Sequence, residues 1–143
     1  MTVTVSTDLP ISADQAWGLA QKPALLAYVL KPFLSTRGEL PERVAEGEEL
    51  SAKLRFLGVL PGWTHTLRIE RLVPGEIVSR EGGGPVKRWN HRLTFEPLSE
   101  RSCRYTDAVD VAAGPFTPLV WLFAAFIYRY RHRRWRTLAR VLA

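Results

Sequence analysis

The feature that most constrains the fold of this chain is its last fifth, residues 114–143, where an apolar run turns abruptly into an arginine run. Placed at about 100° per residue, the apolar side chains fall on one side of a single helix. The predicted stripe is Phe116, Leu119, Val120, Phe123, Phe126, Ile127, Tyr130, Thr137, Leu138 and Val141. Because the stripe continues through the arginine-rich half, both halves are expected to form one long helix that lies across a sheet.

One arginine of this helix, Arg134, falls inside the predicted apolar stripe. Arg129, Arg136, Arg140 and His132 fall on the opposite side, where solvent is expected. A buried guanidinium needs a carboxylate or several carbonyl groups as partners. We therefore expect Arg134 to meet an acid from the sheet, or to reach a cavity mouth and meet an anionic group of a ligand.

The stretch from Val111 to Tyr128 carries no charge and leads into the arginines. A bilayer core of ~30 Å needs about 20 apolar residues to span it. Here the first residues are required to finish a strand, and Gly114, Pro115 and Pro118 interrupt the remainder. The sequence therefore does not predict a membrane-spanning helix.

Charge narrows the range of partners. The 143-residue chain has a net charge of +6, and from Arg129 onward it carries six arginines and no acid, so the rest of the chain is neutral overall. An anionic membrane surface could therefore be a partner of the C-terminal arginines. No base-reading motif accompanies them, so nucleic-acid binding is not expected.

Cysteine content and the N-terminal residues bear on localisation. The single cysteine, Cys103, cannot form an intrachain disulfide, and the first residues lack the charged and apolar regions of a signal peptide. A reducing, cytoplasmic location is the expectation.

The order of secondary structure follows from the apolar periods. Residues 3–7 alternate between apolar and hydroxyl side chains, which predicts a first strand. Ser12 and Gln15 fit a capping box that starts a short helix. Pro23 is placed to start a second short helix. From residue 34 to residue 112 the apolar period is two, which predicts about six antiparallel strands. The glycines at 82–84 predict a turn or a bulge rather than a phosphate loop, because no helix start follows them.

Two local patterns carry a resemblance to a known family. The segments 89–96 (WNHRLTFE) and 105–109 (YTDAV) resemble paired strands of bacterial polyketide cyclase/dehydrase-like proteins, and Tyr130-Arg131-His132 resembles a motif of their final helix. These proteins belong to the START/Bet v 1-like (SRPBCC) superfamily. The resemblance implies an α+β helix-grip fold over residues 1–143, in which a curved antiparallel sheet of about seven strands, in the order β-α-α-β6-α, wraps around the long helix and encloses an apolar cavity.

The strands at 86–96 and 102–112 suggest a candidate catalytic pair. If Phe95 pairs with Cys103, His91 lies opposite Asp107 on the apolar side of the hairpin, whereas a two-residue slip is expected to separate the two side chains. A histidine held by a carboxylate can act as a general base, as a cyclisation or dehydration requires. The alternative is that His91 and Asp107 are a satisfied polar pair within the core.

The expected function is the binding of a small or medium hydrophobic ligand, with or without cyclase/dehydratase activity on a polyketide-like substrate. The alternative is a noncatalytic lipid or hydrophobic-ligand carrier, or an interaction protein at a membrane surface. The residues expected to contact the ligand are Tyr28, Phe56, Trp63, His65, Trp89, Tyr105, Phe123, Ile127 and Arg134. His65, His91 and His132 show no metal-ligand spacing, so neither a metal nor another cofactor is expected.

Overall fold

The computed structural model describes residues 1–22, 25, 28, 34–37, 45–56 and 60–143. Within this part, residues 34–37, 52–56 and 60–61 are described by their backbone. The elements are β1 (Thr2–Leu9), α1 (Ala13–Ala20), β2 (Leu34–Arg37), β3 (Glu49–Phe56), β4 (Leu60–Val73), β5 (Glu76–Gly83), β6 (Val86–Ser99), β7 (Ser102–Ala112), η1 (Gly114–Phe116) and α3 (Thr117–Leu142).

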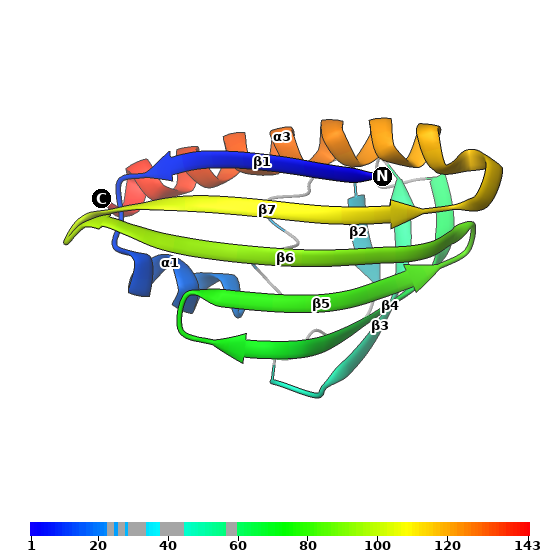
Figure 1. Ribbon diagram of the computed structural model, residues 1–143, viewed down its shortest axis with the longest axis horizontal. Helices are drawn as coiled ribbons and strands as arrows, with labels where there is room; N and C mark the ends of the chain where they lie inside the picture. The colour runs from blue at the N-terminus through cyan, green and yellow to red at the C-terminus, as the bar shows by residue number, and fades with distance from the viewer. Residues whose placement is uncertain (23–24, 26–27, 29–33, 38–44, 57–59) are drawn as a thin grey trace.

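The strands form one antiparallel sheet in the order β1-β7-β6-β5-β4-β3-β2. Figure 1 shows α3 running along β1 and β7, with α1 at the end of the molecule where α3 finishes. This seven-stranded sheet with a long C-terminal helix confirms the α+β helix-grip architecture that the sequence predicts. No helix in the described residues is long and apolar enough to cross a bilayer.

The strands form where the apolar period is two. Along β6 and β7 the odd-numbered residues from Trp89 to Phe95 and from Cys103 to Val111 are buried, and their neighbours are more exposed. One face of the sheet is thereby directed at α3, as expected for an antiparallel sheet with a single solvated face. The predicted hairpin of β6 and β7 is present, but it is longer and tighter than expected.

The first helix begins as predicted. Ser12 is the N-cap of α1, and its Oγ accepts a hydrogen bond from the Gln15 amide at 3.1 Å. The second predicted helix, from Pro23, lies outside the described residues except for Leu25 and Tyr28.

The register of the β6/β7 hairpin differs from the predicted one by two residues. Phe95 pairs with Tyr105 rather than with Cys103, and His91 pairs with Val109. The turn is shorter than expected, because pairing continues to Ser99 and the strands shift register just before it. A shift of two residues keeps every side chain on its face, so the buried set is unchanged.

The helix α3 is continuous, as predicted, but its buried face is not the predicted stripe. The described residues that it buries are Ala124, Ala125, Ile127, Tyr128, Arg131, His132, Trp135 and Ala139. The members of the predicted stripe that are exposed instead are Leu119, Phe126, Thr137 and Val141, together with Phe116 just before the helix. The helix is thus rotated by roughly a third of a turn from the prediction. The buried alanines allow the helix backbone to approach the sheet closely. A prediction that considers only the large apolar side chains gives these alanines too little weight.

The described residues form two buried apolar clusters. One lies around α1 and the C-terminal half of α3 and includes Phe95, Tyr105 and Trp135. The other lies around the N-terminal half of α3 and includes Trp89 and Tyr128. The buried side chains of His91, Asp107, Arg131 and His132, described next, belong to neither cluster.

Candidate functional site

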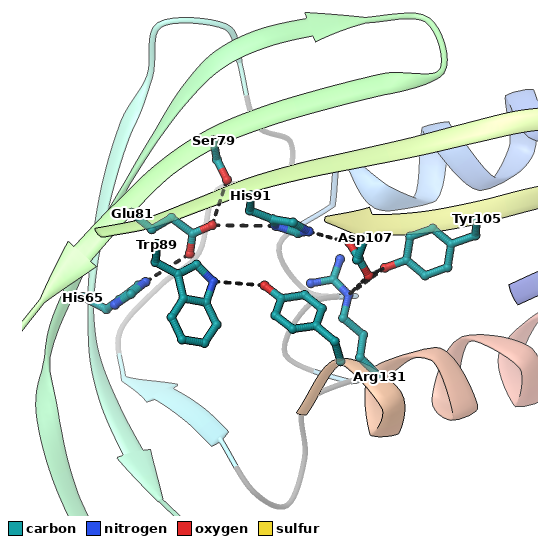
Figure 2. A network of polar contacts seen from close by, with 9 residues as sticks. His65, Ser79, Glu81, Trp89, His91, Tyr105, Asp107 and Arg131 are labelled. Carbon is teal, nitrogen blue, oxygen red and sulfur yellow. Dashed lines mark hydrogen bonds and ion pairs between the residues drawn. The ribbon is translucent and has the colours of Figure 1, made fainter. Parts of the chain in front are cut away.

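A buried carboxylate on β7, that of Asp107, is the centre of a polar network between the sheet and α3. Only 1% of Asp107 is exposed. It accepts short hydrogen bonds from His91 Nε2 and from the Tyr105 hydroxyl, and a third from His132 Nε2 at 2.9 Å. The Arg131 Nε lies 3.6 Å from the same carboxylate. Figure 2 shows His91 from β6, Tyr105 from β7 and Arg131 from α3 around Asp107.

The surroundings of Asp107 stabilise its charged form. Burial alone would raise the pKa of this carboxyl, but the positive charges of Arg131 and His91 and the hydrogen bonds from both histidines outweigh burial. The pKa of Asp107 is therefore held well below its usual range. Asp107 is an ionised acceptor, not a proton donor.

A second carboxylate, that of Glu81 on β5, lies on the other side of His91 with its side chain 10% exposed. It binds His65 Nε2 at 3.0 Å and accepts a hydrogen bond from the Ser79 hydroxyl at 2.7 Å. The His91 Nδ1 lies 3.8 Å away. Although burial opposes ionisation, the hydrogen bonds and charges of the two histidines lower the pKa of Glu81 to about 2.

His91 therefore bridges two carboxylates. Burial by itself disfavours the imidazolium, but the charge of Asp107 and the hydrogen bonds to Asp107 and Glu81 raise the pKa of His91 above its usual value. With His91 protonated, its charge and that of Arg131 balance those of Asp107 and Glu81. These four charges then sum to zero, which makes their burial tolerable.

Arg131 is held in the network by two groups. Its Nε donates to the Tyr105 hydroxyl at 2.9 Å, and that hydroxyl donates in turn to Asp107. Burial and the neighbouring carboxylate raise the pKa of Tyr105 well above its usual range. Tyr105 is thus a neutral link between the guanidinium and the carboxylate.

Aromatic side chains fill the space on the α1 side of the network. The Tyr105 ring stacks on the ring of His132 with centroids 4.2 Å apart, and on Phe95 at 5.1 Å. Trp135 packs against Tyr105 at 5.3 Å. These large buried rings leave this end of the interior as packed core.

The opposite side of the network is bounded by Trp89 and Tyr128. The Trp89 Nε1 donates to the Tyr128 hydroxyl at 3.1 Å, and burial raises the pKa of that hydroxyl above its usual value. His65 lies edge-on to Trp89 with centroids 6.4 Å apart, and His91 lies 5.2 Å from Tyr128. Four rings from β4, β6 and α3 therefore meet at this point, and Figure 2 labels His65, Trp89 and His91 among them.

Comparison with known proteins identifies the family. A family model described as Domain of unknown function (DUF8410) matches residues 7–139. The chain belongs to the DUF8410 family. A search of curated proteins finds no match to it.

Solved structures share the fold of this DUF8410 domain at low sequence identity. Protein CV1439 from Chromobacterium violaceum superposes with a TM-score of 0.79 at 14% identity, over 96% of each chain. A START superfamily protein from Mycobacterium smegmatis gives 0.76 at 13% identity, over 99% of each chain. Zhui aromatase/cyclase from Streptomyces sp. R1128 gives 0.70 at 13% identity, over 98% of this chain and 93% of the other. These similarities show that the DUF8410 domain has the START/Bet v 1-like fold.

The predicted pair of His91 and Asp107 is in contact in the DUF8410 domain, although the predicted register is wrong. In the observed register the two residues are diagonal rather than direct neighbours. Diagonal pairs on one face of a sheet lie within reach of long side chains. The expectation that a two-residue slip would separate them is therefore wrong.

Arg134 forms no ion pair with an acid among the described residues, and its expected contact with an anionic ligand group stays a prediction. Its guanidinium lies over the Tyr28 ring, 4.3 Å from the centroid, and donates to the Tyr28 carbonyl at 3.4 Å. The arginine that meets the acid of the sheet is Arg131, which is 7% exposed. His132, expected in solvent, is 1% exposed and bonds to Asp107. Both differences follow from the rotation of α3.

Of the remaining predicted ligand residues, four lie in or against one apolar cluster and the side chain of the fifth is not described. Ile127 and Trp89 are buried in the cluster at the N-terminal half of α3, and Trp63 and Phe123 pack against it half-buried. The Phe56 side chain lies outside the described part of the chain.

Sequence reasoning missed Glu81, Ser79, Arg131 and Tyr128. Ser79 and Glu81 share a face with Ile77, so strand alternation already directs both inward. Arg131 stands inside the Tyr130-Arg131-His132 motif, which could have marked it as inward-facing. Among the described residues, no group of three or more metal-ligating side chains is positioned to hold a metal ion.

Proposed function

We propose that this DUF8410 domain binds a small or medium hydrophobic molecule between α3 and the sheet, on the Trp89 and Tyr128 side of the polar network. The observation that carries the proposal is the division of the interior by that network. A polar layer across a core offers an orienting surface to an apolar ligand lying against it.

The two sides of the layer differ in how they are filled. On the α1 side, Trp135 and Tyr105 are 1% and 0% exposed, and their rings pack with centroids 5.3 Å apart. On the other side Trp63 and Phe123 pack only half-buried against the cluster. Half-buried aromatic walls around a few polar groups are typical of sites for small hydrophobic ligands. This contrast supports placing the ligand next to Trp89.

Two polar groups favour a ligand that carries a hydroxyl or carbonyl group. His65 uses Nε2 to bind Glu81, and its buried Nδ1 has no hydrogen-bond partner among the described residues. The Tyr128 hydroxyl accepts a bond from Trp89 and also carries a proton that it can donate. A ligand hydroxyl can bond to His65, and a ligand carbonyl can accept from Tyr128.

The state of His91 favours a noncatalytic binder over an enzyme that uses this residue as a base. Its ring nitrogens face Asp107 and Glu81, and both carboxylates favour the protonated ring. A protonated imidazole has no lone pair with which to remove a proton.

A cyclase or dehydratase is the second candidate, and two observations favour it. The pairing of His91 with Asp107 is a form of acid/base site, and Zhui, with the same fold, is an aromatase/cyclase. The raised pKa of His91 suits a general acid, which would protonate the hydroxyl that leaves as water in a dehydration.

Native mass spectrometry of the purified protein, followed by thermal unfolding with hydroxylated aromatic compounds and fatty acids, tests binding. A ligand at a hundredfold excess over its Kd stabilises by about 2.7 kcal/mol. For a domain of this size we expect Tm to rise by about 5–10 °C. No copurified ligand and no Tm shift with either class would contradict the proposal.

Two tryptophan variants locate the site. Trp89→Phe removes the indole donor to Tyr128 and is expected to weaken binding by about tenfold. Trp121→Phe is the matched control, because its Nε1 donates instead to the Thr2 carbonyl at 3.0 Å and is partly exposed. Equal effects of the two variants would place the ligand elsewhere.

His91→Gln separates the binder from the enzyme. If the domain is a binder, the variant retains ligand affinity, and neither protein converts a bound polyketide-like substrate. If wild-type protein forms a cyclised or dehydrated product and His91→Gln does not, the second candidate holds.

A further inference from the structure

Large apolar side chains are exposed on the outer side of α3 at its N-terminal end. Leu119, Leu122 and Phe126 are 65%, 58% and 51% exposed, and Phe116, just before the helix, is 57% exposed. The three helical residues follow one another at intervals of three and four, so they lie on one line along the helix. Burial of the opposite side against the sheet directs this line away from the core.

The same line continues as arginines in the C-terminal half of α3. Arg129, Arg133 and Arg140 are exposed. Arg136, between them, is half-buried and donates to the Thr7 hydroxyl at 3.0 Å. The outer face is thus apolar at one end and cationic at the other, and residues 111–143 contain no acid that could neutralise it.

The surroundings of the apolar end are also cationic. The exposed Lys87 side chain lies beside Gly114, at the turn that leads into the helix. Asp110, the nearest acid in sequence, is bound by Arg88 at 2.9 Å and by the N-terminal amine at 3.3 Å. No net negative charge from these groups opposes an anionic partner.

We propose that the outer face of α3 docks on the surface of an anionic lipid bilayer. The helix lies obliquely, with Phe116, Leu119 and Leu122 dipping into the interface and the arginines binding lipid phosphates. Leu119 and Arg129 are ten residues apart, or about 15 Å along the helix. Interfacial helices bury apolar side chains to a depth of about 5–10 Å. The spacing therefore allows insertion at one end while the arginines stay at the level of the phosphates.

An anionic bilayer can bind both the apolar half and the cationic half of this face. A second copy of the chain or a nucleic acid would not bind both halves. In a dimer through α3, parallel helices would bring arginines against arginines, and antiparallel helices would bring arginines against the apolar end. Neither arrangement gives the arginines an acid. A nucleic acid would bind the arginines but leave Leu119, Leu122 and Phe126 in water. The inference is independent of the proposed ligand site, which lies on the inner side of α3.

Flotation of the intact protein with vesicles tests the inference. Wild-type protein is expected to float with vesicles of phosphatidylcholine and phosphatidylglycerol, and much less with phosphatidylcholine alone. Replacing Arg129, Arg133 and Arg140 with glutamine should weaken binding by about fivefold per arginine, or on the order of 100-fold in total. Leu122→Glu should weaken it by at least about tenfold.

Matched controls carry the same charge changes elsewhere on the surface. Leu98→Glu alters an apolar side chain that is 44% exposed in β6, and a triple glutamine variant replaces the exposed arginines Arg68, Arg80 and Arg101. Both controls should bind like wild-type protein, and circular dichroism should show that all variants are folded. The proposal is overturned if wild-type protein does not float with the mixed vesicles, or if the controls lose as much binding as the α3 variants. It is equally overturned if Leu122→Glu instead dissolves a dimer that does not bind vesicles.

Discussion

Replacing Asp107 with asparagine removes the carboxylate on which the buried network converges while keeping the shape of the side chain. The change leaves the Arg131 guanidinium, which is 7% exposed, beside a neutral amide. It also removes the charge that raises the pKa of His91. Breaking a buried ion pair by deleting one partner costs about 3–5 kcal/mol. Because domains are stable by about 5–15 kcal/mol in total, we expect a large loss of the free energy of unfolding.

The loss should depend on pH in a defined way. Asp107 has a lowered pKa, so its contribution is present above its unfolded pKa of about 4 and is lost as pH falls through the folded value. His91 has a raised pKa, so its contribution is present below its unfolded pKa of about 6.5 and is lost as pH rises through the folded value. Both contributions coexist at about pH 5–6. The difference between wild-type protein and Asp107→Asn should be largest there.

Urea unfolding followed by circular dichroism and tryptophan fluorescence, repeated across this pH range, measures the difference. Asp110→Asn is the matched control, because Asp110 lies on the same strand with its side chain 39% exposed. The control should leave the unfolding midpoint nearly unchanged. If Asp107→Asn costs no more than Asp110→Asn at any pH, the reasoning about a buried, charge-balanced network is refuted.

Three further predictions follow from the network and the backbone. Arg131→Met should cost about 3 kcal/mol in urea unfolding, because this guanidinium is buried beside the Asp107 carboxylate. Arg134→Met should cost less than about 1 kcal/mol, because that guanidinium stacks on the Tyr28 ring. Equal costs would contradict the conclusion that Arg131 is the partner of Asp107. His91→Gln should remove the decline in stability above about pH 6.5, and an unchanged pH profile would show that His91 is not held protonated. Gly83→Ala should cost at least about 2 kcal/mol, because φ is +152° and a Cβ would overlap a backbone carbonyl of β4. Gly18→Ala in α1 places its Cβ in open space and should stabilise the protein by about 0.5–1 kcal/mol. Thermal unfolding that ranks the two alanine variants in the opposite order would contradict this.

The sheet and its buried face could be predicted from the sequence, because a two-residue error of register does not change which side chains along a strand face the core. The two-residue error in the β6/β7 hairpin left His91 and Asp107 on the same face. Their contact was therefore predictable even though their pairing was not. The Ser12 cap was predictable for another reason, since capping depends on a few adjacent residues.

The face of α3 could not be predicted from apolar content alone. Ala124 and Ala125 face the sheet, while Leu122 and Phe126, which are more hydrophobic, face outward. The buried side is set by how closely the helix backbone can approach the strands, and this depends on side-chain volume as well as hydrophobicity. Arg131 is buried because Asp107 compensates its charge, and that partner is 24 residues away in sequence. Such compensation is visible only once the fold brings the two together.

Glu81 illustrates the same limit on another element. In sequence it stands before three glycines and looks like a polar residue at the end of a strand. In the structure it receives His65 from β4 and faces His91 from β6. Three strands must be aligned before its role becomes clear.

The most direct test of hydrophobic-ligand binding next to Trp89 uses the indole N–H resonances of the five tryptophans in a ¹H–¹⁵N spectrum. Adding a ligand identified by native mass spectrometry should shift the resonances of Trp89 and Trp63, which border the proposed site. The resonance of Trp135, packed at the other end of the core, should stay in place. Shifts confined to Trp135, or no shift at any tryptophan under saturating ligand, would contradict the account.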